Sequence, residues 1–318
     1  MYPKKIIILQ HNGGRLANQL WNFASIYAYS LEKKYECRNY SFFEYGHYFE
    51  RIKTDNLLVD VLFFRTFEAL EYIFPFKVAR KIARILYGSY VRSMEFFHKD
   101  EMIRYGDNNQ NPYYLPPTRQ SIGSLKMLEE NNDIGKVYFY GWLFRDPAGL
   151  EKYRDRVVAY FTPGERYLKN ANEQIRKLRS EYNRIIGVHI RKGDYKSWNG
   201  GNFSIDEKRF REVLDEYVRH FTVDPGKTAF LFFSDGRVDL STFNGLHTFS
   251  PYNRYDVGDL YELSMCDVII GSDSTFGAFA SYYGKIPFIV ATNDAMQWDY
   301  YNDKRSYFEN KFSKVVHY

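Results

Sequence analysis

The chain has 318 residues, of which 45% are hydrophobic and 26% are charged, so we expect a globular rather than a disordered protein. The length suggests about two domains and is ample for a sizeable core. The formal net charge of +5 is too small to indicate nucleic-acid binding by itself, and it suits an anionic ligand or an anionic membrane surface.

Cysteine usage and the apolar runs indicate a cytoplasmic protein. Cys37 and Cys266 are far apart, and the seven histidines show no metal-ligand spacing, so neither a disulfide scaffold nor a zinc site is expected. No signal peptide is visible, and no apolar run approaches the ~20 residues that span a membrane. We therefore expect a reducing, cytoplasmic location and no bound metal.

The first elements predict an α/β domain that opens with a glycine-rich turn. Residues 6–9 form an apolar run typical of a buried strand, and residues 20–31 carry apolar side chains at helical spacing. Residues 12–19, between them, form a turn of the kind that presents backbone N–H groups to a phosphate. Arg15 and Asn18 are the polar side chains best placed to reach such a ligand, and helix capping or solvent exposure explains them equally well.

Residues 57–94 are predicted to be helical, with a break near residues 74–76. The second helix, which begins at Lys77 and ends at Tyr90, has apolar residues on one face and basic residues on the other. These are Val78, Ile82, Ile85 and Leu86 on the apolar face, and Lys77, Arg80, Lys81 and Arg84 on the basic face. Such a helix can lie on anionic lipid headgroups at the inner face of a membrane. Packing of its apolar face on the domain core is the commoner arrangement, and we favour it.

The second half of the chain alternates strands and helices, which predicts a parallel sheet. Another strand, at residues 137–140, precedes a turn at residues 162–164. This turn separates an N-terminal domain of residues 1–165 from a C-terminal domain of residues 166–318. The predicted strands of the second domain are residues 185–190, 229–233, 267–270 and 286–291, and its predicted helices are residues 205–220, 259–265 and 276–283.

Three strands of the second domain end in polar residues. The clusters contain His189, Arg191 and Asp194 after the first strand, Ser234 and Asp235 after the second, and Ser272, Ser274 and Thr275 after the third. The carboxyl ends of parallel strands meet at one crevice, where ligands of open α/β sheets bind. Structural alternatives remain at each position: an ion pair between Arg191 and Asp194, a turn role for Asp235, and a plain helix cap at Ser274.

These clusters suit an anionic ligand. The guanidinium of Arg191 can hold a phosphate through two parallel hydrogen bonds, and Ser274 and Thr275 stand where a helix begins and its dipole favours negative charge. Asp235 can accept hydrogen bonds from a guanine edge. No Asp-x-Asp triplet is present to hold a metal on a nucleotide-sugar. Charge on a leaving diphosphate would then be met by Arg191 and by fixed dipoles.

Residues 189–195, His-Ile-Arg-Lys-Gly-Asp-Tyr, resemble the His-x-Arg-Arg-Gly-Asp-Tyr motif of the α-1,2-fucosyltransferases of glycosyltransferase family 11. Residues 13–19 resemble the glycine-rich Asn-Gln signature of that family, and residues 259–266 with residues 274–276 resemble its third block. The resemblance covers nearly the whole chain. The first two motifs also recur in α-1,6- and protein O-fucosyltransferases, so they indicate GDP-fucose more firmly than a linkage.

The resemblance implies a GT-B-like α/β fold, in which two Rossmann-like domains face each other across a cleft. It also implies a GDP-fucose donor, a glycan acceptor, and inversion at the fucose anomeric carbon without metal or other cofactor. The implied donor-binding residues are His189 and Arg191 at the phosphates, Asp235 with Ser234 near guanine, Ser274, Thr275 and Phe276 around the diphosphate, and Arg15 and Asn18 from the other domain.

We therefore expect an α-1,2-fucosyltransferase of bacterial surface-polysaccharide synthesis, with Arg191 and Asp194 as catalytic residues. Asp194 is the first choice of base, and His11 and Asp146 are the others. Lys192 in place of the second arginine departs from the family pattern, as do Ala17 for glycine and residues 277–279. These departures bear on the acceptor and the linkage more than on the donor. The alternatives are transfer to form another linkage, transfer from another nucleotide-sugar on the same scaffold, and a glycan- or nucleotide-binding protein without catalysis, which Lys192 and the altered third block keep open.

Overall fold

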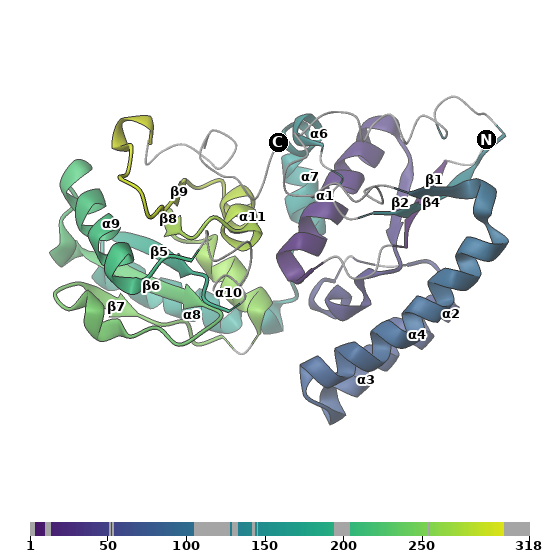
Figure 1. The fold of residues 1–318 in the computed structure, drawn as a ribbon, viewed down its shortest axis with the longest axis horizontal. Helices are drawn as coiled ribbons and strands as arrows, with labels where there is room; N and C mark the ends of the chain where they lie inside the picture. Colours follow the sequence, from purple (N-terminus) through teal and green to yellow (C-terminus); the bar gives the residue numbers. More distant parts are fainter. Residues whose placement is uncertain are drawn as a thin grey trace. The chain divides into compact units, whose positions relative to one another are not determined.

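The computed structural model describes residues 4–9, 14–50, 52, 54–104, 128, 133–141, 144, 146–193, 204–253 and 255–301. The chain divides into two compact units, Met1–Gly164 and Glu165–His317, and each contains a parallel sheet covered by helices (Figure 1). The predicted α/β class is therefore confirmed. Within the described residues, no helix is long and apolar enough to cross a membrane.

The first unit is built on a four-stranded parallel sheet with the strand order β2-β1-β4-β3. The strands are β1 (Lys5–Ile8), β2 (Glu36–Asn39), β3 (Met102–Arg104) and β4 (Lys136–Tyr140). The helices are α1 (Leu16–Lys33), α2 (Leu57–Val59), α3 (Thr66–Ile73), α4 (Phe76–Phe97), α6 (Pro147–Lys152) and α7 (Arg154–Tyr160), with a π-helix, η3 (Asp60–Arg65), between α2 and α3. Short 3-10 helices are η1 (Phe42–Glu44), η2 (Gly46–Tyr48) and η4 (Lys99–Glu101).

The α2–α4 segment covers one face of this sheet. Side chains that alternate along β1 and β4, including Ile7 and Tyr138, pack with an aromatic and small-residue cluster. The cluster is formed by Leu9, Tyr40, Phe43, Val59, Phe63, Phe67, Ala79, Ala83, Tyr87 and Val91. The predicted break between two helices is confirmed, because α3 ends at Ile73 and α4 starts at Phe76, and the two helices lie side by side (Figure 1).

The second of these helices packs on the domain core, as expected, but the face expected to make this contact is wrong. The residues of its predicted apolar face, Val78, Ile82, Ile85 and Leu86, are exposed, whereas Ala79, Ala83, Tyr87 and Val91 are buried. Alanines at spacing i, i+4 let the helix approach the aromatic cluster closely, and Tyr87 then fills the space between Phe43 and Phe63. Shape complementarity, rather than residue hydrophobicity alone, selects the buried face.

The second unit is built on a five-stranded parallel sheet with the order β7-β6-β5-β8-β9. Its strands are β5 (Arg184–Ile190), β6 (Thr228–Ser234), β7 (His247–Phe249), β8 (Val268–Gly271) and β9 (Phe288–Val290). Its helices are α8 (Glu165–Glu181), α9 (Glu207–His220), α10 (Asp256–Leu263) and α11 (Thr275–Gly284), with 3-10 turns η8 (Pro225–Lys227), η9 (Leu240–Phe243) and η10 (Trp298–Tyr300). Numbered from β5, the strand order is 3-2-1-4-5, the doubly wound order of Rossmann-like sheets.

This order places a topological switch point between β5 and β8. The chain moves outward from β5 through β6 to β7 and then returns to the other side of β5 to form β8. The core of the unit packs α9 against the middle strands, through Phe210, Leu214 and Tyr217. Because crevices in open α/β sheets form at the carboxyl ends beside such a switch point, the polar residues that follow β5 and β8 are the first place to search for a site.

Candidate active site

The carboxyl ends of β6, β5 and β8 bring three polar clusters of the second unit together. Ile190 of β5 pairs in register with Ser234 of β6, so Arg191 and Asp235 both come one residue later at the same level. On the other side, His189 pairs with Gly271 of β8. The clusters that the sequence places after three separate strands are therefore neighbours along one edge.

Arg191 is fixed from both neighbouring strands. Its backbone N–H donates to Ser272 Oγ at 3.0 Å, and its Nε lies 3.2 Å from Asp235 Oδ2. Ser272 is fully buried, and its own N–H donates to the carbonyl of His189 at 2.9 Å. The side chain of Arg191 is 15% exposed. An anion at this position would meet a partly shielded, pre-positioned cation, the arrangement in which electrostatic stabilisation is strongest.

Asp235 holds the turn that follows β5. Its Oδ1 accepts hydrogen bonds from the backbone N–H groups of Lys192 at 2.8 Å and Gly193 at 3.0 Å, while Oδ2 faces Arg191. One carboxylate therefore positions both the backbone and the guanidinium of the arginine motif. Asp235 makes an ion pair with Arg191. Asp194, the ion-pair partner that the sequence suggests, lies outside the described residues.

His189 is buried beside Arg191 and is held as a neutral imidazole. Its Nδ1 lies 3.2 Å from Ser274 Oγ, and its ring stacks on Phe276 with 5.1 Å between the ring centroids. The pKa of His189 falls from 6.5 to about 3, mainly because burial disfavours the charged ring; the positive charge of Arg191 also lowers this pKa, and Asp235 opposes the shift. A neutral ring beside Arg191 avoids like-charge repulsion at this edge.

Ser274 connects the imidazole to the start of α11. Its Oγ is the N-cap of the helix and accepts from the backbone N–H of Gly277 at 3.3 Å. A Cβ atom at Gly277 would lie 3.0 Å from Phe288 and 3.5 Å from His189 Nδ1, so glycine permits the close approach of α11 to β5. The predicted helix start at Thr275 is confirmed. Its N-terminal dipole lies at the same edge as Arg191.

Ser234 and Lys192 have local structural roles. Ser234 Oγ accepts from the backbone N–H of Gly236 at 3.1 Å. The ammonium of Lys192 is bound by the Glu207 carboxylate, at the start of α9, and by the carbonyl of Arg237 at 2.6 Å. The lysine that replaces the second arginine of the family motif thus joins the turn to α9.

The glycine-rich turn of the first unit brings Gly14 and Asn18 together. Gly14 has a φ of +81°, in the left-handed region that glycine adopts without strain. A Cβ at Gly14 would lie 2.3 Å from Asn18 Nδ2, so the amide packs directly over the glycine. Arg15 follows at the N-cap position of α1, is exposed, and makes no side-chain cap hydrogen bond.

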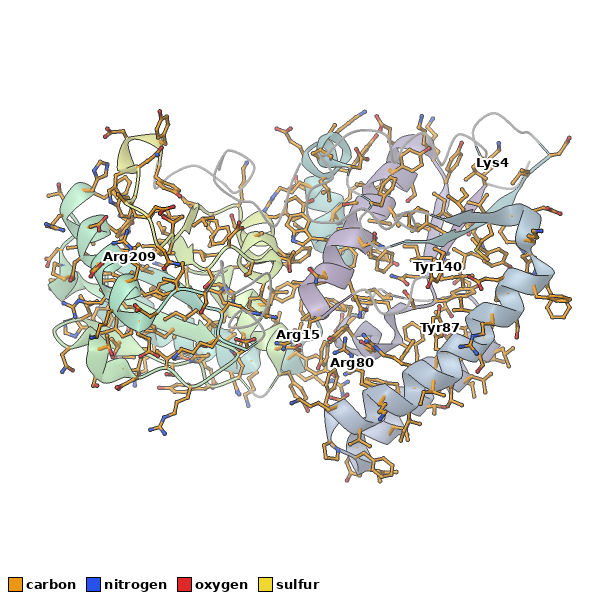
Figure 2. All side chains as sticks on the ribbon, in the orientation of Figure 1. Lys4, Arg15, Arg80, Tyr87, Tyr140 and Arg209 are labelled. Carbon is orange, nitrogen blue, oxygen red and sulfur yellow. The ribbon has the colours of Figure 1, made fainter. Side chains whose placement is uncertain are left out.

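A buried carboxylate, which the sequence alone did not reveal, supports this turn. Glu44 is 1% exposed, and Arg80 Nε at 2.9 Å, Arg84 Nη2 at 3.1 Å and Gln19 Nε2 at 3.1 Å all donate to its Oε2. Arg80 and Gln19 also donate to the carbonyl oxygen of Gly14, at 2.6 and 3.2 Å. Figure 2 labels Arg15, which precedes α1 at the N-cap position, and Arg80 of α4. The only sequence signal was the i, i+4 spacing of the two arginines.

Of the three candidate bases, Asp146 lies within the described residues. Asp146 is buried and caps α6, with Oδ1 accepting from the backbone N–H of Gly149 at 3.1 Å, which is a structural role. His11 and Asp194 lie outside the described residues. Among the described residues, no group of three or more His, Cys, Asp or Glu side chains is arranged to hold a metal ion.

Several solved structures share this fold. A mutant of FUT1 from Arabidopsis thaliana in complex with GDP aligns over 92% of this chain and 72% of its own, with 13% identity and a TM-score of 0.54. POFUT1 in complex with GDP-fucose aligns over 91% and 97%, with 12% identity and a TM-score of 0.51. NodZ α-1,6-fucosyltransferase soaked with GDP-fucose aligns over 90% and 94%, with 14% identity and a TM-score of 0.53, and NodZ has also been solved from Bradyrhizobium. The expected GT-B-like fold class is therefore confirmed.

The sequence comparison identifies the family. The profile of glycosyl transferase family 11 matches residues 145–312, which is more than half of the 318 residues. The chain therefore belongs to glycosyl transferase family 11. A comparison with curated proteins found no match.

The buried, neutral His189 predicts a specific acid sensitivity. Its pKa in the folded protein, about 3, lies below its ordinary value of 6.5, so only the unfolded chain takes up this proton between those values. His189 should therefore lower the free energy of unfolding by about 1.4 kcal/mol for each pH unit below 6. Unfolding by urea at pH 7, 6, 5 and 4 should show a steeper loss for wild type than for His189→Gln.

The exposed His247 provides the matched control. His247→Gln should retain the wild-type pH dependence. Titration of the imidazole nitrogens by NMR gives a direct second readout. The His189 chemical shifts should remain those of a neutral imidazole down to pH 5. Protonation of His189 near pH 6.5 in the folded protein would contradict the prediction.

The Glu44 cluster predicts a large stability effect from one carboxylate. Glu44→Ala leaves two partly buried arginines and the Gln19 amide without the carboxylate to which all three donate, so the free energy of unfolding should fall by about 2–4 kcal/mol. Urea unfolding measures this loss. Glu50→Ala, at an exposed acid of the same unit, should change it by less than about 0.5 kcal/mol. Equal effects of the two substitutions would show that the cluster contributes no special stability.

Proposed function

We propose that this protein transfers fucose from GDP-fucose to a glycan hydroxyl, with inversion and without a metal ion. The observation that carries the proposal is the pre-positioned Arg191, which Asp235 and Ser272 hold beside the N-terminus of α11. Membership of glycosyl transferase family 11 supports sugar transfer. The complexes of FUT1, POFUT1 and NodZ, which share the fold, contain GDP or GDP-fucose and support the choice of donor.

In the proposed reaction, the acceptor oxygen bonds to the fucose anomeric carbon as the bond from that carbon to the donor phosphate oxygen breaks. The electron pair leaves with GDP, and negative charge grows on the diphosphate. Arg191 and the N-terminal dipole of α11 stabilise this negative charge and so take the part that a metal ion would otherwise play. The acceptor proton passes to a base, for which Asp194 is the candidate, or to solvent if the transition state is largely dissociative and needs little base assistance.

The finer specificity rests on the sequence motif. The third block, residues 259–266 with residues 274–276, resembles that of the α-1,2-fucosyltransferases, so the proposed product is an α-1,2 linkage to a galactosyl unit. The proposed setting is synthesis of a bacterial surface polysaccharide in the cytoplasm. The fold alone does not select the linkage, because the NodZ structure that shares it is named an α-1,6-fucosyltransferase.

Donor binding is tested first by thermal stabilisation. GDP and GDP-fucose, each at 100 times its dissociation constant, should stabilise the protein by about 2.7 kcal/mol. The stabilisation should survive a chelator, because Arg191 and fixed dipoles bind the diphosphate. UDP at the same concentration should stabilise less. The measurement is the melting temperature with each ligand, with and without EDTA.

Asp235→Asn separates two roles for that carboxylate within the same assay. If Asp235 only positions Arg191, affinity should fall by the same factor for GDP and for inorganic diphosphate. A contact with the base predicts a larger loss for GDP and a weaker preference over UDP. Absence of stabilisation of the wild type by any guanine nucleotide would contradict the proposed donor.

Arg191→Ala should lower turnover of GDP-fucose by at least about 10²–10³-fold, because it removes the cation that stabilises the leaving diphosphate. Arg191→Lys should recover part of the loss, since it restores the charge without the planar fork. Turnover is measured as GDP release with a β-galactoside acceptor, and NMR of the product identifies the linkage.

Arg176→Ala, at an exposed arginine of α8, is the matched control and should retain wild-type turnover. Circular dichroism and melting temperature establish that each variant is folded. Wild-type turnover by a folded Arg191→Ala protein would remove Arg191 from the mechanism. An α-1,6 or other product would correct the linkage and leave fucosyl transfer in place.

One observation favours a second candidate, a nucleotide- or glycan-binding protein without catalysis. Lys192, which replaces the second arginine of the family motif, is bound by Glu207 and by the Arg237 carbonyl. Its ammonium therefore stabilises the turn after β5. Such a protein would bind GDP yet release none from GDP-fucose with a panel of galactoside acceptors. The turnover assay therefore separates the two candidates.

A further inference from the structure

Exposed apolar side chains concentrate on one segment of the first unit, residues 57–97, here called the helical hairpin. Thirteen of the fifteen strongly exposed large hydrophobic side chains of the described residues belong to it. They are Leu57, Leu58, Val61, Leu62, Tyr72, Ile73, Phe74, Val78, Ile82, Ile85, Leu86, Phe96 and Phe97. Exposure reaches 94% at Tyr72 and 81% at Phe96. Concentrations of this kind mark an interaction surface.

The exposed residues form ordered stripes. On α4, Val78, Ile82, Ile85 and Leu86 follow the spacing i, i+4, i+7, i+8, which places them on one side of the helix. On the preceding helical segment, Leu58 and Leu62 are exposed at spacing i, i+4, and Ile73 is exposed at the end of α3. Both helices bury their opposite sides in the same cluster, through Phe63 and Phe67 from one and Ala79 and Ala83 from the other. The exposed apolar side chains therefore lie on the sides of these helices that do not contact the common core.

Basic residues surround these stripes. Of the predicted basic face of α4, Arg80 and Arg84 turn inward to Glu44, whereas Lys77 and Lys81 are exposed. The other exposed cations of residues 57–97 are Arg65 and Arg92, and the exposed acid in that span is Glu68. Most exposed side chains of the helical hairpin are consequently apolar, and most of the exposed charged ones are positive.

We infer that the helical hairpin docks on an anionic lipid bilayer, with its apolar stripes in the headgroup–acyl boundary and its lysines and arginines at the lipid phosphates. Apolar and aromatic side chains edged by Lys and Arg are the composition that binds such an interface. Tyr72, Phe96 and Phe97 suit the interfacial position that aromatic rings prefer. The segment would lie on the bilayer, because no described helix is long and apolar enough to cross one.

Charge favours a lipid surface over a second copy of the chain. A two-fold dimer interface is self-complementary, so the same patch of both copies would face each other. Pairing two such hairpins would bring the exposed cations of one copy, Arg65, Lys77, Lys81 and Arg92, against the same positively charged patch of the other, with Glu68 as the exposed opposing charge. Anionic headgroups supply the complementary sign at every one of these positions.

The test is flotation of the full-length protein with vesicles. Wild type should float with vesicles of phosphatidylcholine that contain about 30% phosphatidylglycerol, and much less with pure phosphatidylcholine. Raising the salt from about 0.1 M to about 1 M should weaken binding, because surface charges are screened. Lys77→Glu/Lys81→Glu should weaken binding to the anionic vesicles by at least tenfold. Ile85→Ser/Leu86→Ser should weaken binding through loss of the apolar contact.

Matched controls lie in the second unit. Lys169→Glu/Lys177→Glu on α8 makes the same change in net charge at exposed lysines, and Tyr252→Ser removes an exposed aromatic side chain. Both should float like wild type. Melting temperatures establish that the variants are folded, which is expected because the substituted side chains are exposed.

Two results would overturn the inference. One is equal flotation of wild type, both hairpin variants and the controls, or no flotation with anionic vesicles. The other is a concentration-dependent dimer in sedimentation velocity that Ile85→Ser/Leu86→Ser dissociates, which would assign the surface to a second copy. Flotation does not require the sugar donor, so its failure and a failure of fucosyl transfer are distinguishable.

Discussion

The second unit depends on one carboxylate that joins two strands. Asp235 follows β6, yet both of its oxygens serve residues that follow β5: the backbone N–H groups of Lys192 and Gly193, and the guanidinium of Arg191. The parallel register sets this up, because Ile190 pairs with Ser234. The sheet thereby fixes a cation at the end of its central strand before any ligand binds, and pre-positioning is what makes such a charge effective in stabilising a transition state.

The interior strands were predictable from the sequence, as was the edge strand β9, whereas the edge strands β2, β3 and β7 were not. β5, β6 and β8 are buried on both faces, so their apolar runs are uninterrupted and were recognised. β2, β3 and β7 are edge strands of three or four residues with polar side chains, such as Glu36, Arg38 and His247. These strands contain too few alternating apolar residues to show a strand pattern in the sequence. They are strands because their backbones pair with a neighbouring strand.

At the candidate site, the sequence identified which strand ends carry polar residues but not which residues pair. An ion pair within residues 191–194 was the simplest local alternative, whereas Arg191 contacts Asp235, 44 positions away, because β6 lies beside β5. In the first unit, the inward turn of Arg80 and Arg84 depends on Glu44, whose position in a short 3-10 helix carries no periodic signal. The same inward turn explains why the apolar stripe of α4 is left outside.

The two cysteines give the chain an unusual chemical property. Each unit contains one of them, both are buried, and burial raises the thiol pKa of Cys37 to about 12 and that of Cys266 well above its ordinary value. The thiolate is the reactive form, so neither side chain competes for alkylating reagents or oxidants while the protein is folded. The natural sequence therefore serves as its own unreactive background, in which a single cysteine introduced at the surface can carry a dye, a spin label or a cross-linker without removal of the native pair.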